Sequence, residues 1–133
     1  MEYIYIFIMD IITILNKKSE KTIIKKLSKN GLLLNKLSNS AKNNFKIVLV
    51  AVKQNGLAIQ YASNDLKNNY DIALEAVKQN GYAYEYLPDK LKYNLKIIIE
   101  SLKQNINVLK LLPENFKNYK SYLISKIDYE IYT

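Results

Sequence analysis

A four-residue sequence, Lys-Gln-Asn-Gly, returns along this chain every 25 residues, and this period restricts the fold more than any other feature. It occupies residues 53–56 and 78–81, with a partial copy at 103–106 and a divergent one at 28–31. A fixed period of this size is typical of stacked supersecondary units. We therefore predict a single helical-repeat domain over residues 1–133, with the first and last of its units acting as caps. The units are 7–31, 32–56, 57–81, 82–106 and 107–131.

Each unit carries the hydrophobic pattern of one long helix. In the second unit, Phe45, Val48, Leu49 and Val52 recur at the spacing of one helical face. Asparagine precedes this run in three successive units, where its side chain can cap the helix. Ala51 and its counterpart one unit later are small enough to let neighbouring helices approach closely.

A short second helix is expected after each long one, followed by a single turn that begins at serine or proline. The fold class is therefore all-α, a solenoid-like array of about four to five 25-residue repeats, each with a long helix, a glycine-capped turn and a short helix. Only residues 3–9 could form a strand instead. The short helices are expected at residues 32–37, 57–62, 82–87 and 107–112.

The glycine of the repeated sequence is expected to end the long helix, whose last turn (Lys53 and Gln54 in the second unit) is expected to be exposed. We predict that Gly56 adopts the left-handed conformation, with Val52 and Leu57 forming the apolar contact of a Schellman motif. Ile106 suits that conformation badly, so Asn105 or its neighbour Asn107 is expected to adopt it in the fourth unit.

The segment Ile47-Val-Leu-Val-Ala-Val-Lys-Gln-Asn-Gly-Leu-Ala-Ile-Gln-Tyr-Ala-Ser63 and its copy from Ile72 resemble a known repeat. The pattern is similar to that of family 4116 of the domains of unknown function. This resemblance implies helical repeats, and a family found largely in giant DNA viruses, protists and some bacteria. It implies no activity and supplies no catalytic residues.

The composition argues against an enzyme. The chain has no cysteine and no histidine, so the commonest general base and the commonest metal ligand are both absent. The 12 acidic residues are scattered along the chain, with Glu75 and Glu100 in one column that we interpret as solvated. No phosphate-binding loop or nucleophile motif occurs. We expect no catalysis, no cofactor and no metal.

The net charge of +8 results from 20 lysines against 12 acidic residues, and the chain has no arginine. Lysine, asparagine, isoleucine and tyrosine make up 66 of the 133 residues, which indicates an AT-rich genome. This bias weakens the basic charge as evidence for a nucleic-acid partner. The missing arginine also removes the usual bidentate ligand for phosphate.

Two sets of lysines are candidate interaction surfaces. Ten lysines lie within residues 17–53, where Glu20 is the only acidic residue. Four of them share helical spacing on the first long helix, and a second set recurs at a period of 25. Such lysines could bind an acidic polymer or protein, but repeated charge is more often a solvated face. The first set is Lys18, Lys21, Lys25 and Lys29, and the second is Lys17, Lys42, Lys67, Lys92 and Lys117.

Tyr61 and Tyr86 form a third candidate, because they share one position of the repeat. Tyrosine suits interfaces, since it joins an apolar ring to a polar hydroxyl. The alternative is a half-buried position between units.

Residues 3–15 are strongly apolar and too short to span a bilayer. A signal peptide is disfavoured, because Glu2 stands where a positive charge is expected. The segment is therefore expected to be either a buried first element or a docking segment.

The sequence as a whole favours an intracellular or virion-associated protein that acts as a non-catalytic protein-interaction or structural module. The alternative is a binder of nucleic acid or another polyanionic surface through residues 17–53. The oligomeric state stays open.

Overall fold

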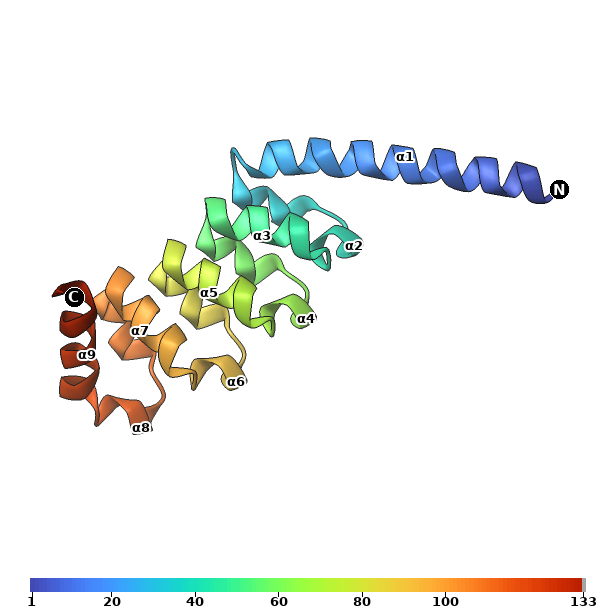
Figure 1. Ribbon diagram of the computed structural model, residues 1–133. Coiled ribbons are helices and arrows are strands. Elements are labelled where there is room, and N and C mark those ends of the chain that lie inside the picture. Colours follow the sequence, from blue (N-terminus) through green and yellow to red (C-terminus); the bar gives the residue numbers. More distant parts are fainter. Residues whose placement is uncertain (133) are drawn as a thin grey trace.

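The computed structural model describes residues 1–132, and within them every regular element is helical. A 26-residue helix, α1 (Glu2–Leu27), leads into a stack of repeats and projects well beyond it (Figure 1). The all-α repeat array predicted from the sequence is confirmed. The strand considered for residues 3–9 is wrong, because these residues form the first turns of α1.

Each repeat contains a short 3-10 helix, a one-turn helix and a longer α-helix. The 3-10 helices are η1 (Gly31–Lys36), η2 (Gly56–Tyr61), η3 (Gly81–Tyr86) and η4 (Ile106–Leu111). The one-turn helices are α2 (Asn39–Lys42), α4 (Asn64–Lys67), α6 (Asp89–Lys92) and α8 (Glu114–Lys117). The longer helices are α3 (Phe45–Gln54), α5 (Tyr70–Gln79), α7 (Leu95–Gln104) and α9 (Lys120–Tyr132).

The elements are arranged in columns that run along the array. Helices α3, α5 and α7 contact one another in order, and the four 3-10 helices form a second column against them. The core lies between these two columns, where Val48, Ile72 and Ile97 are fully buried. The one-turn helices follow one edge of the array, and α9 lies at the end away from α1 (Figure 1).

Asparagine and serine start the helices as predicted. The side chains of Asn44, Asn69 and Asn94 each accept a hydrogen bond of 3.1 Å from the backbone N–H three residues later. Ser38 and Ser63 cap α2 and α4 in the same way. These caps fix where each of these helices begins.

The predicted Schellman motif is wrong, because no residue in the described part of the chain has a positive φ. Asn55 instead bends the chain with φ −147° and ψ 111°, in the extended region. Its side chain then accepts a hydrogen bond of 3.0 Å from the Leu57 N–H and caps η2. Asn105 takes the same extended conformation, so the left-handed residue expected there is absent too.

Glycine is required here for a different reason, which is close approach between units. A Cβ built on Gly56 would lie less than 3.0 Å from the Ala76 carbonyl oxygen of the next unit. Gly31 and Gly81 meet the carbonyls of Ala51 and Ser101 in the same way. Ala51 and Ala76, which were predicted to let neighbouring helices approach closely, are both fully buried at this contact.

Glutamine completes this contact. The Gln79 Oε1 accepts a hydrogen bond of 2.5 Å from the Gly56 N–H, and Gln54 accepts one of 2.6 Å from Gly31. Gln54 is exposed, as predicted for the last turn of its helix, and the structure adds that its side chain bonds the preceding unit. We call each such pair, a glycine of one unit bonded to a glutamine of the next, a Gly–Gln joint.

Candidate functional site

The first half of α1 is an uncovered apolar helix. Twelve large apolar side chains within residues 1–15 are each at least 42% exposed. A buried first element is therefore wrong for this segment, and a docking segment stays a prediction. Across residues 1–132, no helix combines the length and hydropathy needed to cross a membrane.

Five of the lysines predicted to form an interaction surface follow that apolar segment directly, and all of their side chains are exposed. Four belong to α1, and the fifth lies in the turn between α1 and η1. Between them, Glu20 forms an ion pair of 3.4 Å with Lys46 of α3. The five are Lys17, Lys18, Lys21, Lys25 and Lys29.

The predicted lysine column is only partly a column in space. Lys42, Lys67, Lys92 and Lys117 each end a one-turn helix on the same edge of the array. Lys17 lies within α1 and has no such helix around it, so the structure separates it from the other four. The next three along the column are half-buried and Lys117 is exposed.

Tyr61 and Tyr86 end the 3-10 helices η2 and η3, and their rings are partly exposed. The structure brings Lys67 and Tyr86 to one shallow cavity of about 420 Å³ between α4 and the turn after η3. One unit earlier, the corresponding elements α2 and the turn after η2 are also in contact, since the Ser63 N–H donates a hydrogen bond to the Lys42 carbonyl at 2.9 Å. We call Lys42, Lys67, Lys92, Lys117, Tyr61 and Tyr86 the Lys–Tyr row.

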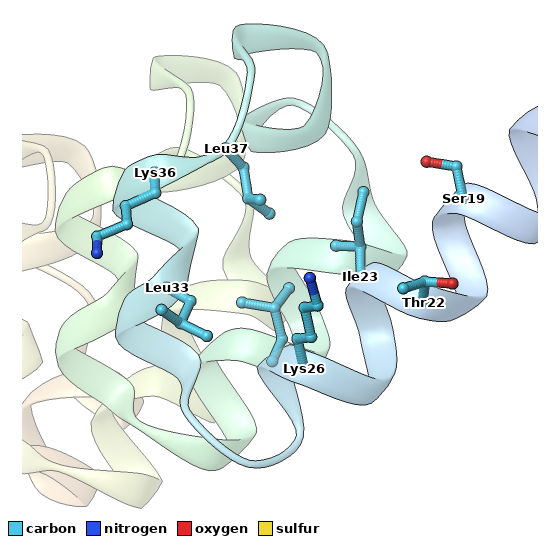
Figure 2. Close-up of a pocket in the computed structure, with 8 residues that line it drawn as sticks. Ser19, Thr22, Ile23, Lys26, Leu33, Lys36 and Leu37 are labelled. Carbon is cyan, nitrogen blue, oxygen red and sulfur yellow. The ribbon is translucent and has the colours of Figure 1, made fainter.

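A second cavity, of about 550 Å³, lies between α1 and η1 (Figure 2). Ile23 on α1, Leu33 within η1 and Leu37 just after η1 line it with apolar atoms, and Lys26 of α1 also lines it with an exposed side chain. The cavity lies where α1 contacts η1, the first 3-10 helix of the column.

Two polar residues of the array were not anticipated. Glu100 is 9% exposed, although its column was interpreted as solvated. Burial alone would raise the pKa of Glu100, but hydrogen bonds and charges from Lys96 at 3.0 Å and Lys103 at 3.4 Å lower it overall. The sequence signal for this ion-paired position is the helical spacing of Lys96 and Lys103, four residues before and three residues after Glu100.

Tyr84 is fully buried, and its hydroxyl donates a 2.7 Å hydrogen bond to the Lys92 carbonyl. Burial, with smaller effects from Tyr93 and Asp89, raises the pKa of Tyr84 far above its ordinary value. This tyrosine therefore stays neutral and ties η3 to α6. It has no signature in the repeat, since the corresponding residue one unit earlier is Ile59.

Among the described residues, no group of three or more acidic side chains is arranged to hold a metal ion. The arrangement instead offers an apolar helix, a lysine cluster and a row of lysine and tyrosine side chains. These are features of binding surfaces.

Comparison with known proteins gives one family. The family model described as a domain of unknown function (DUF4116) matches residues 20–67, 44–92 and 69–117. These overlapping matches cover the repeats from the end of α1 to the one-turn helix α8. No curated protein and no solved structure is significantly similar to the chain.

Proposed function

This chain belongs to the DUF4116 family of domains of unknown function, and we propose a role for it from the geometry of its surface. It is a non-catalytic helical-repeat module that binds another protein through the Lys–Tyr row. The observation that carries this proposal is the meeting of Lys67 and Tyr86 in one cavity between neighbouring units. Stacked repeats commonly bind partners along such an extended surface.

The chemistry of the row favours a protein partner with acidic side chains. A half-exposed tyrosine offers an apolar ring for contact and a hydroxyl for hydrogen bonding. Tyr86 is 37% exposed, and Lys67 supplies a positive charge beside it. An extended acidic segment could contact several units in turn, because Lys42 and Tyr61 repeat the pair one unit earlier.

The non-catalytic part of the proposal is supported by the composition. General acid–base or nucleophilic chemistry would have to proceed without histidine or cysteine. The two side chains with altered pKa values, Glu100 and Tyr84, are both engaged in contacts within the array. An intracellular location agrees with a chain that contains no cysteine.

Affinity capture from a lysate of the native source, with matched variants, tests this proposal. Lys67→Ala/Tyr86→Ala removes one pair of the row, and Lys126→Ala/Tyr122→Ala removes a pair on α9 whose ammonium lies 5.6 Å from the ring centroid. We expect at least one captured protein to be lost with the first variant and retained with the second. If every captured protein is retained by both variants, the row is not the binding surface.

A second candidate function, binding of nucleic acid or another polyanionic surface, is supported by the exposed lysines that begin at Lys17 on α1. A labelled single-stranded RNA and a DNA duplex test it at low and physiological salt. Binding through these lysines should weaken steeply as salt increases, because counterions are released from the polyanion. Binding that ignores salt would exclude this candidate.

A further inference from the structure

The uncovered half of α1 requires an explanation that the Lys–Tyr row does not supply. Residues 1–15 carry apolar side chains on nearly every side of the helix, and Tyr3, Ile4 and Phe7 are each at least 65% exposed. Monomeric proteins seldom leave contiguous apolar patches larger than a few hundred Å² in water. Figure 1 shows that this half of α1 runs away from the repeats, so none of the described elements covers it.

We propose that α1 docks the protein on the surface of an anionic lipid membrane. Residues 2–16 lie in the plane of the headgroups with their apolar faces embedded, and the lysines that follow contact acidic lipids. This inference rests on α1 alone and does not depend on the Lys–Tyr row.

The charges along α1 select this orientation. Glu2 and Asp10 would have to enter the hydrocarbon if the helix inserted end-on, and buried carboxylates are costly there. With the helix in the plane, Asp10, Thr13 and Lys17 share one narrow stripe at helical spacing and can face water. The Thr13 hydroxyl donates a 2.8 Å hydrogen bond to the Met9 carbonyl, so it brings no unpaired donor to the interface.

The lysines supply the second half of the attachment. Six exposed lysines lie between residues 17 and 29, interrupted by the single acidic Glu20. A basic cluster next to an apolar helix is attracted to acidic lipids, and two such signals together give stable attachment where one alone does not. Tyr3 and Tyr5 also suit the interface, because their hydroxyls can remain among the headgroups.

A nucleic acid or a second copy of the chain would contact only part of α1. A nucleic acid would contact the lysines and leave the apolar half of α1 in water. Pairing with α1 of a second copy would cover one stripe of each helix, although apolar side chains surround nearly the whole helix. A lipid surface accounts for both the apolar residues and the charge that follows them.

Flotation of the full chain with vesicles tests the proposal, using phosphatidylcholine alone and phosphatidylcholine with phosphatidylserine. We expect salt-sensitive binding that prefers the vesicles with phosphatidylserine. Replacing Lys17, Lys18 and Lys21 with Gln should weaken this binding on the order of 100-fold, at about fivefold per lysine. The matched control replaces three exposed lysines of the repeats, Lys90, Lys110 and Lys120, and should leave binding unchanged.

Insertion of the apolar half of α1 can be followed by the fluorescence of a single introduced tryptophan, because the chain contains none of its own. The Phe7→Trp variant should show blue-shifted emission on vesicles and quenching by brominated lipid tails, while the Tyr93→Trp variant in the repeats should show neither. Absence of vesicle binding by a folded chain, or vesicle binding that leaves the emission of the Phe7→Trp variant unchanged, would overturn the proposal. Salt-sensitive RNA binding without vesicle binding would overturn it in favour of nucleic acid. A stable dimer that ignores vesicles would overturn it in favour of a second copy.

Discussion

Replacing Gly56 with alanine tests why the repeated sequence ends in glycine. The new Cβ would meet the Ala76 carbonyl oxygen at less than 3.0 Å and would also crowd the Ala76 carbonyl carbon and the Asn80 Cβ, both at 3.1 Å. The carbonyl would have to retreat by roughly 1 Å to reach ordinary contact. It belongs to the backbone of α5, so it cannot move without shifting a helix that is packed on both sides.

The magnitude follows from three contributions. Overpacking a tight contact costs about 1–3 kcal/mol. Stretching the 2.5 Å hydrogen bond from Gly56 to Gln79 adds about 1 kcal/mol. The lower entropy of unfolded alanine returns about 0.4–1 kcal/mol. We therefore expect Gly56→Ala to lower the free energy of unfolding by about 1–3.5 kcal/mol.

Urea titration followed by far-UV circular dichroism measures this change. Gly56→Asn separates the two explanations for glycine, because asparagine tolerates a left-handed turn but carries the same clashing Cβ. It should be at least as destabilising as alanine. Ile106→Ala is the matched control, since Ile106 occupies the same repeat position with its side chain 50% exposed. Stability of Gly56→Ala within about 0.5 kcal/mol of the wild type would refute the close-approach argument.

Three further variants test individual contacts by the same titration. Gln79→Met leaves the Gly56 N–H without its acceptor and should cost about 1–2 kcal/mol; no loss would show that the Gly–Gln joint adds nothing. Tyr84→Phe removes the 2.7 Å bond to the Lys92 carbonyl and should cost about 1 kcal/mol at neutral pH, and an unchanged midpoint would contradict this. The pKa of Glu100 is lowered on folding, so its stabilisation is present above its unfolded value of 4.5 and is lost as pH falls through the folded pKa. Glu100→Gln should therefore cost about 1 kcal/mol near neutral pH and nothing in strong acid, and an equal cost at both pH values would contradict the assignment.

The repeat architecture could be predicted because its signals are local. The period of the repeated sequence, the asparagine caps and the spacing of residues such as Val48 each depend on neighbours within one unit. They agree with one another, which is the condition under which a sequence pattern predicts a fold. The fold class and the family could therefore be predicted from the sequence.

Features that depend on contacts between units could not be predicted in the same way. A repeated glycine after a helix has the same sequence signal whether it turns left-handed or faces a carbonyl of the next unit. The contact between Gly56 and Ala76 spans 20 residues, and sequence spacing alone does not reveal that the carbonyl points at the glycine. The solvated column proposed for Glu100 follows from its charge, whereas two lysines make its burial tolerable.

The candidate surfaces were predicted in part. The lysines of α1 are exposed as a charged helix face should be, and Tyr86 is a partly exposed interface-type residue. Their grouping depends on where α1 departs from the repeat. A continuous helix from Glu2 to Leu27 replaces the short elements of a first unit, and this separates Lys17 from the Lys–Tyr row.

The Gly–Gln joint makes the contact between units directional, because its two partners come from opposite sides of the contact. In both bonded pairs the glycine belongs to the earlier unit and the glutamine to the later one, so whole units of this kind could be gained or lost by in-frame duplication or deletion without leaving a joint unmatched. The ends differ from the interior at these two positions. Lys29 stands where an inner unit has glutamine, and Ile106 stands where it has glycine. A unit added beside either residue would therefore lack one of the two partners of a Gly–Gln joint.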